Sequence, residues 1–240
     1  MASSRSESMK LIGRVVKERG HAYEVVFNSL FNKRQKHLNF SGASSDCLVS
    51  GNEILKMLKP LGVKGEAVSL KASDTWQFHL GNLSELSDTK YYKNSIKKIT
   101  PKGKKKPQTW GQHNKTFEEQ LKVLNDKEFW WKYLGKGDYL CYTNRKGLWR
   151  FFSMASVIDF ITAYTEWRLL DTGRIKGDYR VNIKNDKGDS SIKLYKGVIT
   201  FEFRDEEHKQ TFVLGAHGAK NGYKFMTILR SYIPYVDVNN

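Results

Sequence analysis

Three acidic residues and one lysine in the first third of the chain have the types and the order that metal chemistry needs. Asp46 begins a short predicted strand. The next predicted strand carries Ser69 and Lys71, and Glu85 follows Lys71 by fourteen residues. A further acid, Glu24, lies on a predicted helix upstream. Carboxylate oxygens hold Mg²⁺, which polarises a phosphoryl group and activates water, and an ammonium group stabilises charge on the attacked phosphate. The order acid, acid, lysine, acid therefore favours metal-dependent phosphodiester cleavage.

The strand that carries the lysine is predicted from alternating apolar and polar residues. Val68 and Leu70 point to one side, and Ser69 and Lys71 point to the other. A lysine on the core face of a strand is unusual, because burying an ammonium is costly unless an anion pairs with it. If the strand that begins at Asp46 pairs with this one, Asp46 and Lys71 lie at adjacent strand ends. The competing interpretation is ordinary surface charge, since charged residues make up 28% of the chain.

Hydrophobic periodicity and turn residues predict both helices and strands along the chain. Helices are expected at 8–32, 74–92, 116–134, 157–170 and 223–232, and strands at 46–50, 67–71, 139–143, 148–152, 179–184, 192–203 and 211–214. The segment 53–60 is predicted as either helix or strand. We therefore expect an α/β fold, with a mixed sheet flanked by helices and a β-rich C-terminal portion.

The domain organisation is predicted from a change in composition after residue 92. Residues 1–92 are expected to form the part of the core that carries the active site, and residues 93–117 a lysine-rich loop. Residues 118–240 are expected to hold the rest of the core and a β-rich recognition portion, either as a separate part or as one continuous domain with residues 1–92.

The charge balance indicates a polyanionic partner. Lys and Arg number 41 and Asp and Glu number 25, which gives a net charge of +16. A generically basic protein is the alternative. The loop is expected to contact phosphates through Lys97, Lys98, Lys102, Lys104, Lys105 and Lys106. Side chains of the types that reach base edges lie in the C-terminal half: Arg168, Arg174, Lys176, Arg180, Asn182 and Arg204.

The two cysteines, Cys47 and Cys141, fit no metal-ligand spacing and lie in apolar, strand-like stretches. We expect buried free thiols in a reducing compartment. Residues 1–10 lack the apolar segment of a signal peptide. No apolar run reaches the roughly 18 residues that a membrane span needs. These features predict a cytoplasmic protein that does not enter the membrane.

A longer stretch around the acids and the lysine contains the segments Arg19-Gly20-His21-Ala22-Tyr23-Glu24, Gly42-Ala43-Ser44-Ser45-Asp46, Val68-Ser69-Leu70-Lys71 and Glu85. It resembles restriction endonucleases of the PD-(D/E)XK superfamily, and in particular the branch that reads CCGG- and CCNGG-type sites. In that branch the second acid before the lysine is replaced, and a downstream glutamate supplies the missing carboxylate. Ser45 replaces the proline of the superfamily name.

The resemblance implies a role for each residue. Asp46 and Glu85 are metal ligands, and Lys71 is the catalytic lysine. Ser69 stands where most members carry an acid, and Glu24 is an accessory acid on the preceding helix. The implied activity is Mg²⁺-dependent cleavage of double-stranded DNA without a small-molecule cofactor. A homodimer is expected, because two cuts in a short palindrome need two active sites related by a two-fold axis.

Two other functions stay open from the sequence. The first is a non-catalytic DNA- or RNA-binding protein that uses the lysine-rich loop. The second is a base-excising or nicking enzyme of another fold that uses the glycine-rich turn around His217. The tryptophans could stack on bases, but Trp130, Trp131 and Trp167 lie in apolar stretches and are expected in the core.

Overall fold

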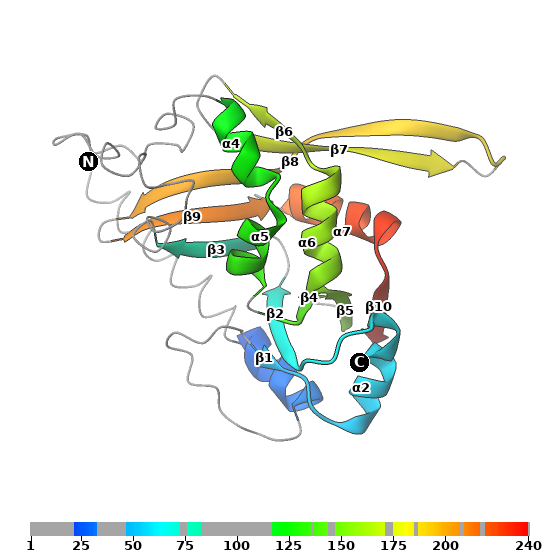
Figure 1. The fold of residues 1–240 in the computed structure, drawn as a ribbon. Helices are drawn as coiled ribbons and strands as arrows, with labels where there is room; N and C mark the ends of the chain where they lie inside the picture. Colours follow the sequence, from blue (N-terminus) through cyan, green and yellow to red (C-terminus); the bar gives the residue numbers. More distant parts are fainter. Residues whose placement is uncertain are drawn as a thin grey trace, which may run out of the picture. The chain divides into compact units, whose positions relative to one another are not determined.

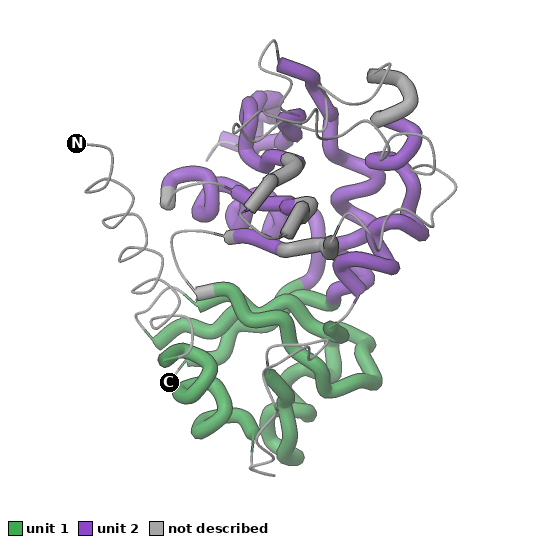
Figure 2. The backbone as a smooth tube through the Cα atoms, turned by 90° about the vertical axis from the view of Figure 1, so that its left-hand side faces the viewer, with its two compact units in different colours: residues 1–72, 136–153, 235–240 green, residues 73–135, 154–234 purple. Residues whose placement is uncertain are grey.

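The computed structural model describes residues 22–32, 47–72, 76–82, 117–135, 137–143, 147–170, 175–184, 187–206, 209–216 and 219–239. The chain divides into two compact units, each assembled from separated stretches (Figure 2). Unit 1 contains residues 1–72, 136–153 and 235–240, and unit 2 contains residues 73–135 and 154–234. Each unit has its own five-stranded sheet (Figure 1). The predicted α/β class is confirmed, with one mixed sheet and a second, antiparallel one.

The sheet of unit 1 is mixed because β2 and β4 run parallel, whereas the other neighbouring strands run antiparallel. Its strands, in spatial order, are β1 (Cys47–Leu48), β2 (Ala67–Ala72), β4 (Tyr139–Thr143), β5 (Leu148–Ser153) and β10 (Tyr235–Asn239). Among its described residues, this unit has helices at 22–31, α2 (Asn52–Leu58) and the 3₁₀ helix η1 (Lys59–Leu61).

One face of this sheet packs against the helix at 22–31. Phe27 and Phe31 lie four residues apart on the helix, so both point to the same side. The Phe27 ring lies 5.6 Å from the ring of Trp149 and 6.0 Å from that of Phe151. Phe31 lies 5.6 Å and 5.8 Å from the same two rings. Edge-to-face aromatic pairs add about 0.5–1.5 kcal/mol each to the burial of their area, so this cluster anchors the helix on the sheet.

Two glycines delimit the segment that the sequence left undecided at 53–60. Gly51, with φ 122°, precedes α2, and Gly62, with φ 67°, follows η1. A left-handed residue directly after a helix is a common helix stop, and glycine adopts that conformation without a steric penalty. The segment is therefore helical, with Ile54 and Leu58 buried.

The sheet of unit 2 is antiparallel throughout. Its strands, in spatial order, are β3 (Trp76–Asn82), β9 (Lys209–Ala216), β8 (Ser190–Glu206), β7 (Ile175–Lys184) and β6 (Glu166–Leu169). The helices in the described part of this unit are α4 (Phe117–Leu124), α5 (Lys127–Leu134), α6 (Met154–Tyr164) and α7 (Ala219–Tyr232).

Aromatic contacts hold the helices of unit 2 on its sheet. Trp130 of α5 lies 6.0 Å from Phe201 of β8 and stacks on Trp167 of β6 at 6.1 Å. Phe160 of α6 stacks on Tyr179 of β7 at 5.3 Å. The prediction that Trp130 and Trp167 belong to the core is confirmed. It is wrong for Trp131, which is 42% exposed.

Two predicted helices are wrong in part because strand pairing overrides their local pattern. The segment predicted as a helix at 74–92 begins as a strand, β3, which pairs with β9. The helix predicted at 157–170 ends at Tyr164 and continues as β6, which pairs with β7. Two ion pairs join β6 and β7: Arg168 with Asp178, and Arg180 with Glu166.

The helix predicted at 116–134 is two helices. The side chain of Asp126 accepts a hydrogen bond from the backbone N–H of Glu128 at 2.9 Å, which caps the start of α5. Strand β10 was not predicted. Its Val238 is buried, and its pairing with β5 completes the edge of the unit 1 sheet.

Candidate active site

Strand β2 separates the residues of the hydrophobic core from those of the candidate site. Val68 and Leu70 belong to the buried cluster of unit 1. Ser69 and Lys71 alternate with them and are half-buried. The predicted alternation is confirmed. Lys71 therefore lies with Ser69 on the face of the sheet opposite Val68 and Leu70.

The register between β1 and β2 places Cys47, the residue after Asp46, opposite Val68, the residue before Ser69. The two strands pair antiparallel, with Cys47 opposite Val68 and Leu48 opposite Ala67. The strand pairing that the sequence required is therefore present. Asp46 itself lies outside the described residues. Cys47, the residue that follows it in the sequence, is buried at the end of this ladder.

A reciprocal contact fixes the start of β2 against β4. The backbone N–H of Asp138 donates to the carbonyl oxygen of Ala67 at 2.7 Å. The backbone N–H of Ala67 donates in return to Oδ2 of Asp138 at 2.8 Å. Gly65 lies against the same carboxylate, and a Cβ atom at that position would be 2.0 Å from Cγ of Asp138. This contact sets which residues of β4 face Ser69 and Lys71.

The row of side chains across the sheet at Lys71 contains a second cation. Lys71, Tyr142, Arg150 and Asp237 occupy matched positions on β2, β4, β5 and β10. Arg150 makes a bidentate ion pair with Asp237, at 2.6 Å and 2.7 Å. Its guanidinium also lies 5.0 Å from the centre of the Tyr235 ring. With strands about 4.8 Å apart, Arg150 lies roughly 10 Å from Lys71 along the row, and its charge is balanced by Asp237.

Both cysteines are buried and free, as the sequence predicts. Burial raises the pKa of the Cys141 thiol well above its usual value, with a further contribution from Cys47. The reactive form of cysteine is the thiolate, so the Cys141 thiol is poorly suited to act as a nucleophile or a metal ligand. Both belong to the core cluster with Val68 and Leu70 and thus face away from Lys71.

The remaining predicted site residues divide by whether the structure describes them. Glu24 is half-buried on the helix at 22–31, as expected for a carboxylate at the border of an apolar face. Among the described residues no group of three His, Cys, Asp or Glu side chains is placed to hold a metal. Outside the described residues lie Asp46, Glu85, Arg174, His217, Lys97, Lys98, Lys102, Lys104, Lys105 and Lys106.

Two of the predicted DNA-binding residues lie on β7. Nζ of Lys176 donates to Oγ1 of Thr200 at 2.6 Å, and Lys176 is half-buried. Nε of Arg180 donates to Oε1 of Glu166 at 2.6 Å. The Arg180 side chain is nevertheless 61% exposed, so its guanidinium remains accessible from solvent.

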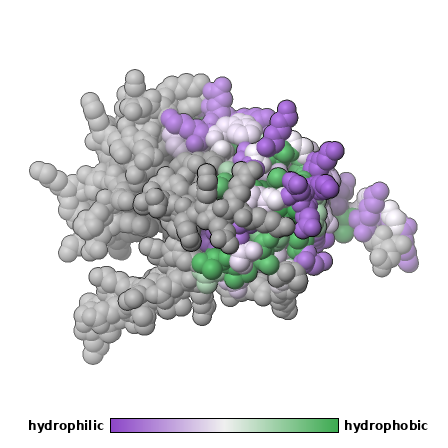
Figure 3. All heavy atoms as spheres, turned by 90° about the horizontal axis from the view of Figure 1, so that it is seen from below, coloured by the Kyte–Doolittle hydropathy of each residue, from purple (hydrophilic) through white to green (hydrophobic). Residues whose placement is uncertain are grey.

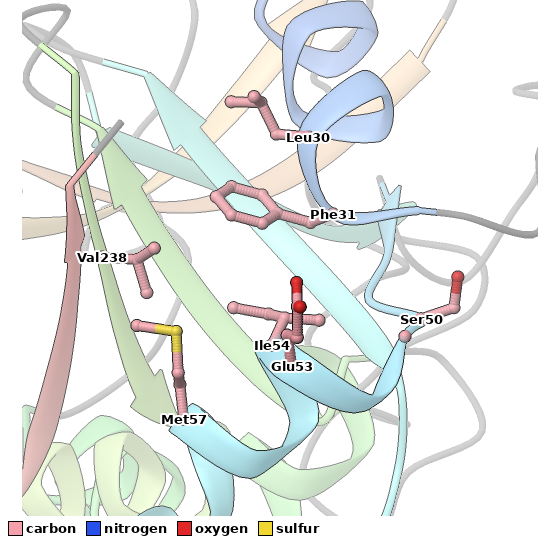
Figure 4. A pocket seen from close by; sticks show the side chains of 8 residues that line it. Leu30, Phe31, Ser50, Glu53, Ile54, Met57 and Val238 are labelled. Atoms are coloured by element: carbon pink, nitrogen blue, oxygen red, sulfur yellow. The ribbon is translucent and has the colours of Figure 1, made fainter.

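A small pocket lies on the core side of unit 1 rather than beside Lys71. Figure 4 shows it between the helix at 22–31, α2 and β10. Its volume is about 120 Å³, below the roughly 300 Å³ at which sites for small ligands begin. Its lining residues are Leu30, Phe31, Ser50, Gly51, Glu53, Ile54, Met57 and Val238. We therefore do not assign a cofactor to it.

The chain matches no protein-family model, no curated protein and no solved structure. The resemblance of residues 19–86 to PD-(D/E)XK enzymes therefore stays a prediction from those residues. In the described part of the chain, no helix combines the length and the apolar character that a membrane crossing requires.

Proposed function

We propose that this protein is a Mg²⁺-dependent endonuclease of the type II restriction class. It hydrolyses double-stranded DNA at a short specific sequence and leaves 5′-phosphate ends. Asp46 and Glu85 hold the metal, and Lys71 stabilises charge on the attacked phosphate or orients the attacking water. Glu24 is an accessory acid. The enzyme acts in the cytoplasm as a homodimer.

The observation that supports this proposal most is the β1–β2 register. Asp46 and Lys71 are far apart in sequence, yet Cys47 pairs with Val68. Cys47 follows the proposed ligand Asp46, and Val68 precedes Ser69, so this pair brings the two segments of the proposed site together. Val68 and Leu70 are fixed in the core, so Ser69 and Lys71 are held on the other face by the strand itself. A rigid strand is a better support for reacting groups than a loop.

The donors at the proposed site suit Mg²⁺. This ion prefers oxygen ligands and keeps several waters in its shell. The Ser69 hydroxyl shares the face of Lys71, whereas the soft thiols of Cys47 and Cys141 belong to the core cluster. Serine provides a neutral oxygen in place of a carboxylate, so β2 carries no acid beside Lys71 and a carboxylate from elsewhere is needed. Glu85 fills that role in the proposal.

The chain's own residues act on the phosphate in distinct ways. When bound, Mg²⁺ would polarise the phosphoryl group and lower the pKa of water. The ammonium of Lys71 supplies up to three N–H donors and a positive charge. It can therefore bind a phosphate oxygen more strongly as negative charge grows in the transition state. The attacking water would form the new P–O bond, and the bond to the 3′ oxygen would break. The 3′ oxygen would leave as a hydroxyl, and the phosphate would stay on the 5′ end.

The direct test is incubation of the protein with plasmid and viral DNA in MgCl₂. Discrete fragments with 5′-phosphate and 3′-hydroxyl ends are expected, and run-off sequencing of the ends gives the recognition site. EDTA and Asp46→Asn should each abolish the fragments. Binding without any cleavage would instead support a non-catalytic nucleic-acid-binding protein. Abasic products would support base excision.

A further inference from the structure

Strands β7 and β8 extend beyond the rest of the unit 2 sheet as a two-stranded ribbon (Figure 1). The ladder of β6 on β7 ends at Asp178, and that of β9 on β8 begins at Thr200. Among the described strands, residues 179–184 and 190–195 therefore pair with each other alone. Six residues of an antiparallel strand span about 20 Å. We name this segment the β7–β8 ribbon.

The base of the β7–β8 ribbon is fixed by a buried carboxylate. The register of β7 and β8 shifts between Gly177 and Tyr179, at Asp178. Oδ1 of Asp178 accepts the backbone N–H of Gly197 at 2.6 Å, and its Oδ2 accepts Nε of Arg168 at 3.1 Å. Gly197 has φ 60°, which glycine adopts without strain. Irregularities of this kind bend and twist a strand pair, so this one sets the direction of the ribbon.

The two faces of the β7–β8 ribbon differ in burial. On one face, Tyr179 and Val181 are buried near the base. On the other face all six side chains are exposed, although two of them are aliphatic: Ile192 is 70% exposed and Leu194 is 41% exposed. We name this the open face. It consists of the cross-strand pairs Arg180 with Leu194, Asn182 with Ile192 and Lys184 with Ser190.

The open face combines polar and apolar groups on a projecting element. Figure 3 shows hydrophilic and hydrophobic residues side by side on the protrusion at its right-hand edge. An isolated two-stranded ribbon is marginally stable in water. The parts of Ile192 and Leu194 that face solvent gain no burial free energy. These features are typical of a surface that is covered by a partner.

The partner that fits this face best is duplex DNA. Residues 179–184 and 190–195 contain three Lys or Arg and no Asp or Glu, so the ribbon is attracted to a polyanion. The major groove of B-DNA is about 12 Å wide and admits a two-stranded ribbon. Asn, Arg, Lys and Ser side chains bond to base edges there, and an apolar side chain contacts the methyl group of thymine. The open face carries all of these types in adjacent pairs.

We infer that the open face of the β7–β8 ribbon enters the major groove and reads the base sequence. Asn182 and Lys184 would bond to base edges, and Ile192 would contact a thymine methyl group. This inference rests on the proposed function, because it identifies the surface by which the proposed endonuclease selects its site.

The first test compares substitutions on the open face with substitutions on the opposite face of the ribbon. The variants are matched, so that each pair changes the net charge equally. Binding is measured in CaCl₂ without Mg²⁺, on duplexes selected from a randomised library by the wild-type protein. Lys184→Ala and Asn182→Ala should each weaken binding to the selected duplex at least about fivefold. Lys193→Ala and Ser191→Ala, which alter the opposite face, should change it less than twofold. Equal effects from both faces would overturn the inference.

The second test addresses the contact of Ile192 with a methyl group. Replacing thymine by uracil in the selected duplex removes each C5 methyl group and should weaken wild-type binding about three- to fivefold per contacted methyl. Ile192→Ala should bind both duplexes equally. Full discrimination by this variant would place the methyl contact elsewhere. If Ile192→Ala instead changed the sedimentation of the protein without DNA, the open face would be a self-association surface, and the inference would fall.

The two proposals fail in different ways. Sequence-selective binding that depends on the open face, without cleavage in Mg²⁺, would leave the inference standing and remove the endonuclease. Site-specific cleavage that is unchanged in Asn182→Ala and Ile192→Ala would leave the endonuclease standing and remove the inference. Thermal unfolding of every variant shows whether reduced binding or cleavage reflects loss of the fold.

Discussion

The alternation of β2 places Lys71 on the face opposite Val68 and Leu70. Those two side chains are held in the core, so Ser69 and Lys71, which alternate with them, point to the other face. Lys71→Ala removes the ammonium group and leaves the apolar side chains of β2 unchanged. The variant therefore tests the proposed role of the ammonium in cleavage.

Lys71→Ala should abolish cleavage in Mg²⁺ while DNA binding stays within a few-fold of the wild type. In the proposed mechanism the lysine acts on one reacting phosphate, whereas most of the binding energy is expected from many other phosphate contacts. Rates on a plasmid substrate and binding in CaCl₂ measure the two effects. Lys56→Ala removes an exposed lysine from α2 and serves as the control with normal cleavage. Cleavage by Lys71→Ala above a tenth of the wild-type rate would remove this residue from the site.

The proposed role of Glu85 as a metal ligand can be tested together with the serine on β2. With Ser69 beside Lys71, loss of one of few carboxylates should be severe, so Glu85→Ala should lose cleavage in Mg²⁺. Adding Ser69→Glu to this variant moves a carboxylate onto β2 and should restore part of the activity, more readily in Mn²⁺, which accepts less ideal ligand geometry. Full activity of Glu85→Ala alone would point to Glu66, Glu53 or Asp74 as the second ligand.

Strand β2 depends on the contact between Asp138 and Ala67. This contact joins strands from distant parts of the chain at the start of their parallel ladder. Asp138→Ala leaves the partly buried N–H of Ala67 without its acceptor. We expect a loss of about 1–3 kcal/mol in the free energy of unfolding, measured with urea. Asp138→Asn keeps an acceptor oxygen and should lose less. An unchanged unfolding midpoint in Asp138→Ala would contradict this account of the strand.

Gly65 tests the same contact from the other side. A Cβ atom there would overlap the Asp138 carboxylate, at 2.0 Å from Cγ, so Gly65→Ala should destabilise the wild-type protein. Without that carboxylate the overlap disappears. In the Asp138→Ala background the substitution should therefore be nearly neutral, with a coupling energy of at least ~1 kcal/mol. Additive effects of the two substitutions would show that they act independently.

At the scale of the whole molecule, the net charge of +16 makes binding dependent on salt. Replacing Lys104, Lys105 and Lys106 by Ala should weaken binding to every DNA sequence about equally. Each lost phosphate contact should lower the slope of log affinity against log salt by about one unit. A control variant removes the same charge at three exposed described lysines: Lys56, Lys64 and Lys132. The control variant should keep the wild-type slope of log affinity against log salt. If the loop variant also kept that slope, the loop would not contact DNA.

Local pattern was sufficient for several strands and for the burial of the cysteines. The alternation at Val68 to Lys71, the hairpin strands at 139–143 and 148–152, and the buried thiols of Cys47 and Cys141 all follow from short-range periodicity and polarity. These features depend on which residues avoid water, a property that each residue carries with it. The acids and the lysine of the candidate site were identified in the same way, by type and order.

Tertiary structure decided every feature that depends on a distant partner. Segment 76–82 is a strand because it pairs with β9, and β6 is a strand because it pairs with β7. The pairing of Cys47 with Val68, the carboxylate of Asp138 at Ala67 and the exposure of Ile192 likewise arise between remote segments. Hydrogen bonds and burial across a sheet are gained only when those segments meet, and no periodicity within a single segment encodes which partner it will find.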